Sequence, residues 1–285
     1  MDSLISTDWL AERLGDPGLV VLDATRHLPA ARRDAAREFA EGHLPGARFL
    51  ELETLYDPDS PVPSALPSAA QLAERLAVLG VEAGDAIVIY DDSAVKTSAR
   101  AWFTLTAHGI ERVAVLDGGL AKWRSEGRPL ESGAGEHRHA APLALAPARE
   151  VAGKVDVLKA LDDYSAQILD ARARERVFGT GTDPVHGGRN GRIPGSLNLP
   201  YGELFAADGT FKPPGTLRAL FEEAGLDWDQ PVITTCGSGV TASVLLFALR
   251  LAGKRDVRLY DGSWQEWEAD PDTPKHEGPV REGAT

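Results

Sequence analysis

The chain contains few of the residues on which several classes of protein depend. It has one cysteine, Cys236, among 285 residues, so an intramolecular disulfide is impossible and zinc sites built from several cysteines are excluded. No apolar run is long enough to span a bilayer. Positive charge is scarce, because 30 Lys and Arg stand against 43 Asp and Glu, a formal net charge of -13. Such a surface repels nucleic acid and anionic membranes, so we expect neither as a partner.

Metal ligands and targeting segments are also missing from the sequence. The seven histidines show no ligand spacing with a carboxylate partner, so we expect no bound metal. The first eight residues lack a basic region followed by an apolar run, which is the pattern of a secretory signal. We therefore expect a cytoplasmic location.

The two halves of the chain carry similar segments in the same order. Residues 20–26 resemble 167–172, residues 43–47 resemble 192–196, and residues 115–119 resemble 259–263. Ordered matches at nearly constant spacing indicate a tandem repeat. The stretch between the copies is rich in Ala, Gly, Pro and His, which is typical of a linker. We expect an N-terminal domain over 1–131, a linker over 132–151 and a C-terminal domain over 152–285.

Each copy alternates short β-branched runs with longer helical patterns. In the second copy we expect strands at 167–169, 232–235 and 257–260, and helices at 216–224 and 240–251. This alternation predicts an α/β fold in which each domain is a parallel sheet with helices on both faces. In such sheets ligands bind at the carboxyl ends of strands. The segment after residues 232–235 is therefore the first place to look for a site.

The only thiol of the protein lies in that segment. Cys236 is followed by two glycines within three residues and then by an apolar helix. Glycines permit backbone conformations in which consecutive amides turn inward and bind an anion, and the helix start adds its own free N–H groups. These features stabilise a thiolate and favour a reactive cysteine over the alternative, a small buried apolar residue. The candidate site comprises Cys236 and the loop Gly237, Ser238, Gly239, Val240 and Thr241.

The first copy serves as an internal comparison for this loop. At the spacing of the nearby repeat matches, Cys236 falls on Asp92, in a loop that has no thiol and no glycine. Thiolate chemistry needs the sulfur itself. We expect the N-terminal domain to be catalytically inactive.

These motifs together resemble a known family, the tandem rhodanese-domain sulfurtransferases. The resemblance rests on residues 169–172, residues 192–196, the Cys236 loop and residues 261–267. The loop itself is similar to that of 3-mercaptopyruvate sulfurtransferases, whereas thiosulfate-using members carry Arg and Lys directly after the cysteine. The resemblance implies transfer of sulfur from 3-mercaptopyruvate, or thiosulfate, through a persulfide on Cys236. The acceptor would be cyanide, a small thiol or thioredoxin, and no metal or organic cofactor would be needed.

The resemblance also implies arginines that bind the substrate. Arg176 falls at the family's substrate-binding arginine, and Arg172 is a second candidate. Where members often have a further arginine, this chain has Val185. Three residues remain candidates for that role: Arg189, Arg192 and His186.

Two departures from the family pattern leave alternatives open. Where mercaptopyruvate enzymes can carry a His and an Asp in the first domain, this chain has Glu53 and Ser64, so a proton relay through Ser238 is not expected. A low-turnover sulfur carrier or a regulatory binding module is therefore a rival interpretation. A cysteine phosphatase is disfavoured, because the arginine it needs six residues after Cys236 is replaced by Ala242.

Overall fold

The computed structural model describes residues 1–135 and 138–279. Residues 136–137, inside the predicted linker, and residues 280–285, inside the predicted second domain, lie outside the described residues. The chain divides into two compact units. The first comprises Met1–Asp59, Leu66–Arg149 and Phe205–Phe211, and the second comprises Ser60–Ala65, Glu150–Leu204 and the chain from Lys212 onward. The sequence did not predict that Ser60–Ala65 belongs to the second unit or that Phe205–Phe211 belongs to the first.

The first unit is built on a sheet of five parallel strands in the order β1-β5-β4-β2-β3. The strands are β1 (Leu4–Ile5), β2 (Leu19–Asp23), β3 (Arg48–Phe49), β4 (Ala86–Tyr90) and β5 (Val113–Leu116). The helices are α1 (Thr7–Ala11), α2 (Ala35–Glu41), α3 (Ala69–Val78), α4 (Thr97–Ala107) and α5 (Gly119–Ser125). Two 3₁₀ turns, η1 (Pro29–Ala31) and η2 (Leu52–Leu55), complete the unit.

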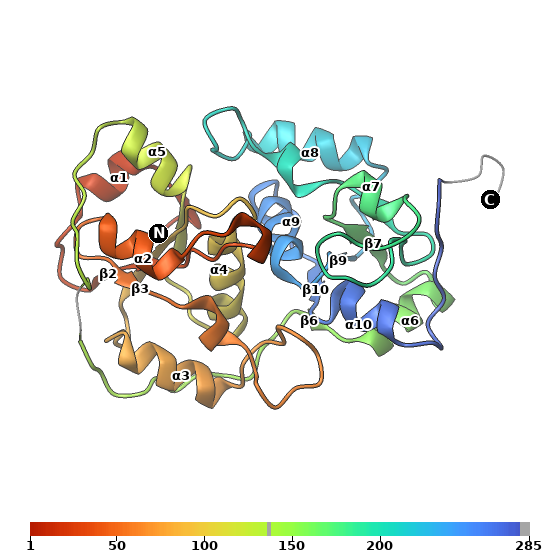
Figure 1. Ribbon diagram of the computed structural model, residues 1–285, viewed down its shortest axis with the longest axis horizontal. Helices are drawn as coiled ribbons and strands as arrows, with labels where there is room; N and C mark the ends of the chain where they lie inside the picture. Colours follow the sequence, from red (N-terminus) through yellow and green to blue (C-terminus); the bar gives the residue numbers. More distant parts are fainter. Residues whose placement is uncertain (136–137, 280–285) are drawn as a thin grey trace. The chain divides into compact units, whose positions relative to one another are not determined.

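The second unit repeats this arrangement in the order β6-β10-β9-β7-β8, and all of its neighbouring strands are parallel. The strands are β6 (Val151–Ala152), β7 (Gln167–Asp170), β8 (Leu197–Asn198), β9 (Val232–Thr235) and β10 (Val257–Tyr260). The helices are α6 (Lys154–Asp163), α7 (Arg174–Val177), α8 (Pro214–Glu223), α9 (Val240–Leu251) and α10 (Ser263–Ala269), with a 3₁₀ turn η3 (Tyr201–Leu204). In Figure 1 these helices surround the strands of their own sheet. The predicted fold class is confirmed.

Burial explains why these segments form central strands. Every residue of β4 and of β9 is buried, as parallel strands covered on both faces require. The helix after β9 is also apolar almost all round, since nine of its twelve residues are buried. No helix in the described part of the chain is long and apolar enough to cross a bilayer.

The strand order of the second unit creates a position suited to a ligand. Strand β8 lies on one side of β7, while β9 and β10 lie on the other. Right-handed connections in the two directions place helices on opposite faces of the sheet. The carboxyl ends of β7 and β9 therefore meet at the point where the topology switches, which is where α/β sheets bind ligands.

Candidate active site

The cysteine loop occupies the carboxyl end of β9. Strand β9 ends at Thr235 and α9 begins at Val240, so Cys236 lies in the turn between them. Gly239 caps the helix with φ 80°, a conformation that costs other residues about 1–2 kcal/mol. Cys236 is a free thiol, and the residue is 2% exposed. Of the predicted loop residues, Gly237, Ser238 and Gly239 lie between strand and helix, whereas Val240 and Thr241 form the first turn of α9.

Ser263 at the start of α10 fixes the backbone of the cysteine. Its hydroxyl oxygen accepts a hydrogen bond from the Cys236 amide (3.2 Å) and donates to the carbonyl of Tyr260 (2.8 Å). The serine adopts φ 49°, in the left-handed region that non-glycine residues seldom enter. Such strain persists where the surroundings demand it. Ser263 was not predicted as a site residue.

The carbonyl groups of the loop are held by the first turn of α10. The amide of Trp264 donates to the Cys236 carbonyl (3.0 Å) and the amide of Gln265 donates to the Gly237 carbonyl (2.9 Å). Because the N–H group of a peptide points away from its carbonyl group, the amides of the same peptides point away from α10.

Several loop amides have no acceptor among the residues that the structure describes. Within residues 1–135 and 138–279, the N–H groups of Gly237, Ser238 and Gly239 donate to no protein atom. Consecutive free amides next to a helix N-terminus form a binding position for an anion. The loop therefore offers hydrogen bonds to a negative charge on Cys236 or on an atom bound to it.

Arg172 is buried beneath the site. Its guanidinium group has no exposed surface and binds the carboxylate of Asp170, the last residue of β7, at 2.6 Å. It also donates to the Gly191 carbonyl at 2.7 Å and lies 4.6 Å from the ring centre of Trp264. These contacts tie the end of β7 to α10.

Arg176, on α7, is held by a second carboxylate. Its Nε and Nη2 atoms donate to the two oxygens of Asp183 at 2.7 to 3.2 Å. The Asp183 side chain is 1% exposed, and the Arg176 side chain is 14% exposed. Burial acts to raise the pKa of Asp183, but hydrogen bonds from Arg176 and from the Val185 amide outweigh it, so the pKa is lowered. The Asp183 carboxylate fixes the direction of the guanidinium group.

His186 lies directly against the cysteine loop. A Cβ atom at Gly237 would lie 2.1 Å from Nε2 of His186 and 3.2 Å from Nη2 of Arg176. The backbone at Gly237 does not adopt a positive φ, so the approach of these side chains, and not the backbone conformation, requires glycine there.

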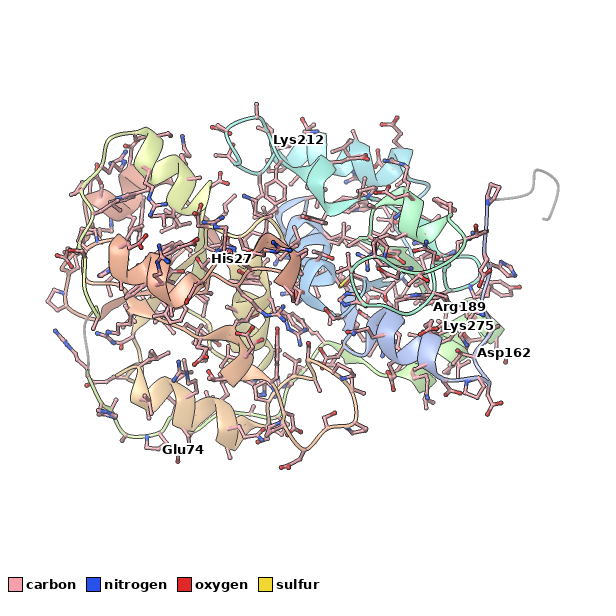
Figure 2. The ribbon with its side chains drawn as sticks, in the orientation of Figure 1. His27, Glu74, Asp162, Arg189, Lys212 and Lys275 are labelled. Atoms are coloured by element: carbon pink, nitrogen blue, oxygen red, sulfur yellow. The ribbon has the colours of Figure 1, made fainter. Side chains whose placement is uncertain are left out.

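The other two candidates for the further cationic contact lie elsewhere. Arg189 has a side chain that is 46% exposed and pairs with Glu277 at 3.3 Å. Figure 2 shows Arg189 close to Lys275, and its charge contributes, after burial, to the lowered pKa of that lysine. Arg192 is buried, donates to the carbonyl of Gly278 at 2.6 Å and lies over the ring of Phe178. Of the three candidates, only His186 is in contact with the loop.

Tyr201 is a further residue at the site that the sequence did not indicate. It begins η3, and its amide donates to the carbonyl of Ala171 at 3.0 Å. Burial raises the pKa of its phenol, while the charge of Arg176 lowers it and the charge of Cys236 raises it again. The phenol therefore lies within electrostatic reach of both groups.

Strand register corrects the comparison with the first unit. The last residue of β4 is Tyr90 and the last residue of β9 is Thr235, and each pairs with the final aspartate of the neighbouring strand β2 or β7. The next residue is Asp91 in the first unit and Cys236 in the second. The predicted equivalence of Cys236 with Asp92 is wrong by one residue.

The side chain of Asp91 is hydrogen-bonded by nearby backbone amides. Its carboxylate accepts hydrogen bonds from the amides of Ser93 (3.1 Å) and Ser98 (2.5 Å). Its carbonyl accepts from the amide of Leu120 at 3.0 Å, as the Cys236 carbonyl accepts from α10. Burial raises the pKa of the Asp91 carboxyl group, although the bonds from Ser98 act against this. In the first unit, backbone amides near the end of the central strand are thus occupied by a side chain.

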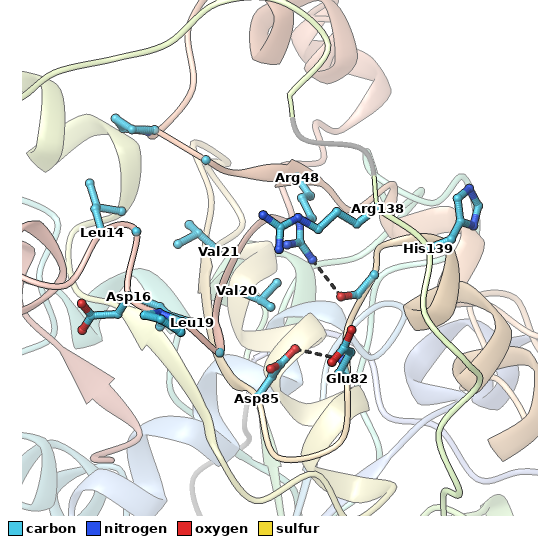
Figure 3. A pocket seen from close by; sticks show the side chains of 16 residues that line it. Leu14, Asp16, Leu19, Val20, Val21, Arg48, Glu82, Asp85, Arg138 and His139 are labelled. Atoms are coloured by element: carbon cyan, nitrogen blue, oxygen red, sulfur yellow. Dashed lines mark hydrogen bonds between the residues drawn. The ribbon is translucent and has the colours of Figure 1, made fainter.

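A hollow in the first unit is lined by different chemistry. Figure 3 shows this space of about 600 Å³, which Asp16, Arg48, Glu82, Asp85 and Arg138 help to line. It lies beside the residues that precede β2 and β4, at the amino ends of the strands. Parallel sheets bind ligands at the other end, and no cysteine is among the described residues that line the hollow. We assign the chemistry to the Cys236 loop.

Comparison with known proteins identifies the family of the chain. A family model described as "Rhodanese-like domain" matches residues 6–126 and 154–270. The 3-mercaptopyruvate sulfurtransferase of Escherichia coli K12 is 40% identical over 271 residues, which cover 95% of this chain and 96% of that protein. The thiosulfate sulfurtransferase of Cricetulus griseus is 37% identical over 97% of this chain and 96% of that protein. A crystal structure of the Escherichia coli 3-mercaptopyruvate enzyme matches with a TM-score of 0.83 at 38% identity, over 93% of this chain and 99% of that one.

The chain belongs to the rhodanese family. Both of its halves match the family model, and its relatives are sulfurtransferases along almost their whole length. Within the family it is a tandem-domain sulfurtransferase.

Proposed function

We propose that this protein moves a sulfur atom from 3-mercaptopyruvate, with thiosulfate as a second donor, through a persulfide on Cys236 to a thiophilic acceptor. One observation carries the proposal: the only thiol of the chain lies in a loop whose amides at Gly237, Ser238 and Gly239 have no acceptor among the described residues. Such amides stabilise a negative sulfur before and after transfer.

The first half of the reaction breaks the carbon–sulfur bond of the donor. The Cys236 thiolate attacks the sulfur of 3-mercaptopyruvate, a sulfur–sulfur bond forms, and the electron pair of the carbon–sulfur bond leaves with pyruvate as its enolate. The enolate carbon takes up the proton that the donor thiol brought. The persulfide keeps the negative charge on its outer sulfur, beside the loop amides.

The second half returns the enzyme to its thiolate. An acceptor nucleophile attacks the outer sulfur, the sulfur–sulfur bond breaks, and the electron pair stays on Cys236. Cyanide would leave as thiocyanate, and a thiol or reduced thioredoxin would leave as a persulfide. No metal or organic cofactor takes part in either half.

Arg176 and Arg172 take different roles in this proposal. Arg176 is partly exposed and reaches the space beside Gly237, so it binds the donor anion through its planar group. Arg172 was also expected to bind the substrate. Its guanidinium group has no exposed surface and is occupied by Asp170, which supports a positioning role for it, between β7 and α10.

The loop chemistry supports 3-mercaptopyruvate as the preferred donor. Gly237 and Ser238 provide no positive charge after the cysteine. Thiosulfate carries two negative charges, whereas the donor carboxylate of 3-mercaptopyruvate carries one. A site with few cations on a chain of net charge -13 favours the less charged donor.

The first unit serves as a structural partner domain in this proposal. The carboxylate of Asp91 fills its loop, so neither a thiol nor free amides are offered there. We also propose that the protein acts in the cytoplasm, where reducing conditions keep a lone thiol available.

The decisive experiment compares two donors on the purified protein and on Cys236→Ala. We expect steady-state release of pyruvate from 3-mercaptopyruvate, slower use of thiosulfate, and no transfer at all by the variant. Mass spectrometry after donor treatment should find the peptide of Cys236 heavier by one sulfur atom. Tyr164→Phe, at a residue that is 81% exposed, serves as the matched control. Persulfide formation without steady-state pyruvate release would favour a low-turnover sulfur carrier instead.

A further inference from the structure

The two arginines near the donor position are each paired with a carboxylate. Arg176 is paired with Asp183, and Arg172 is paired with Asp170. Each pair is neutral as a whole, so neither contributes a net positive charge. An N–H donor that reaches the oxygens of a 2-oxo acid beside Cys236 therefore adds to its binding, because buried anions are stable only when they are hydrogen-bonded.

The space above Gly237 is filled by an imidazole. Nε2 and Cδ2 of His186 would lie 2.1 and 2.4 Å from a Cβ atom at Gly237, and Nη2 of Arg176 would lie 3.2 Å from the same point. The two side chains thus converge over the residue that directly follows the nucleophile. Glycine at 237 and histidine at 186 fit together, and a larger residue at 237 would expel the ring.

One carboxylate positions both nitrogen groups. Asp183 binds Arg176 through its two oxygens. Its Oδ1 also accepts from the amide of Val185 at 2.8 Å and of His186 at 3.4 Å, and its carbonyl accepts from the amide of Gly187 at 3.0 Å. The turn that carries the imidazole is therefore anchored to the same buried group that orients the guanidinium.

We propose that His186 and Gly237 form one element that determines donor specificity, in which the imidazole N–H binds an oxygen of the 2-oxo acid beside Arg176. This inference rests on the proposed function. It assigns to His186 a hydrogen bond and no covalent step, so the proton of the imidazole stays in place. The class of donor selected is a thiol that bears a 2-oxo carboxylate.

The test is a double-mutant cycle on His186→Ala and Gly237→Ala, with 3-mercaptopyruvate as the donor. A hydrogen bond to a charged group contributes about 1.5–3 kcal/mol, so His186→Ala should lower kcat/KM by about 10- to 100-fold, mainly through KM. The inhibition constant of pyruvate should rise by a similar factor. His186→Gln, which keeps an N–H donor, should recover most of both losses, and Tyr164→Phe, at a residue that is 81% exposed, should match the wild type in both.

The second arm of the cycle separates the inference from simpler explanations. Gly237→Ala should resemble His186→Ala in the wild-type background and should add nothing when His186 is already alanine. Additive losses, or a His186→Ala variant with unchanged KM and pyruvate inhibition, would overturn the inference while the wild type still forms pyruvate. A wild type that forms neither pyruvate nor a Cys236 persulfide would instead refute the proposed function, and this inference with it.

Discussion

Asp183 offers the sharpest test of how the site is held together. The variant Asp183→Asn keeps the size of the side chain and removes its charge. Arg176 loses its ionic partner, and an amide NH₂ group replaces one of the two oxygens that accept from it. Removing one member of a buried ion pair costs about 3–5 kcal/mol. Because the Arg176 side chain is 14% exposed and can turn toward water, we expect the lower end, about 3 kcal/mol.

The assay is urea unfolding of the wild type and the variant at several pH values, with the exposed Asp162→Asn as the control. The pKa of Asp183 is lowered in the folded protein. Its stabilising contribution is therefore complete above the ordinary carboxyl pKa and is lost as the pH falls through the lowered one. The difference between wild type and variant should be full at pH 7 and should shrink in acid. A difference below about 1 kcal/mol at pH 7, or one independent of pH, would refute the reasoning.

Substitutions at three further positions test other parts of the fold. Ser263→Ala and Ser263→Gly both lose the hydrogen bond to the Cys236 amide, so both should slow persulfide formation. Alanine retains the strain of φ 49°, so thermal unfolding should show the alanine variant to be about 1–2 kcal/mol less stable than the glycine variant. Equal stabilities of the two variants would contradict this. Gly239→Ala should destabilise by about 1–2 kcal/mol because of φ 80°, and a neutral effect on the urea midpoint would count against the assigned backbone. Burial raises the pKa of Asp23 from 3.8 to about 6, so ionisation of this residue destabilises the folded state as the pH rises through that interval. Asp23→Asn should therefore be more stable than the wild type at pH 8 by about 3 kcal/mol and should lose this advantage near pH 4; a stability difference that does not change with pH would show that the carboxyl group is not perturbed.

The sequence was sufficient where the signal is local. The strands around 232–235 and 257–260 are short β-branched runs, and the helix at 240–251 is a long apolar pattern, so their types and bounds could be predicted. Cys236 was found because a lone thiol between a strand pattern and a helix pattern is itself unusual. Local patterns thus predicted the fold class and led to the nucleophile that we propose.

The sequence was insufficient where a contact joins distant residues. Asp183 is a site residue because Arg176 binds it, and Ser263 is one because the Cys236 amide reaches it across 27 positions. Neither contact leaves a pattern in the chain. A comparison of the repeats holds one signal that could have been used, since Ser263 stands where the first copy has Gly119.

The alignment of the repeats shows a second limit. Motif spacing placed Cys236 opposite Asp92, whereas hydrogen-bonded strand register places it opposite Asp91. A difference of one residue in loop length cannot be detected from the spacing of the repeated motifs, because that spacing itself varies by a few residues between the matched motifs. Only the sheet defines which residues are equivalent.

The carboxylate of Asp91 has a consequence for the history of the duplicated chain. Backbone amides that already bind a neighbouring side chain are not available to bind a substrate. Gaining a thiol at that position would not be enough to revive the first copy, because the neighbouring residues also lack the glycines that turn amides inward. The inactivity that we propose for the first copy is therefore hard to reverse by single substitutions.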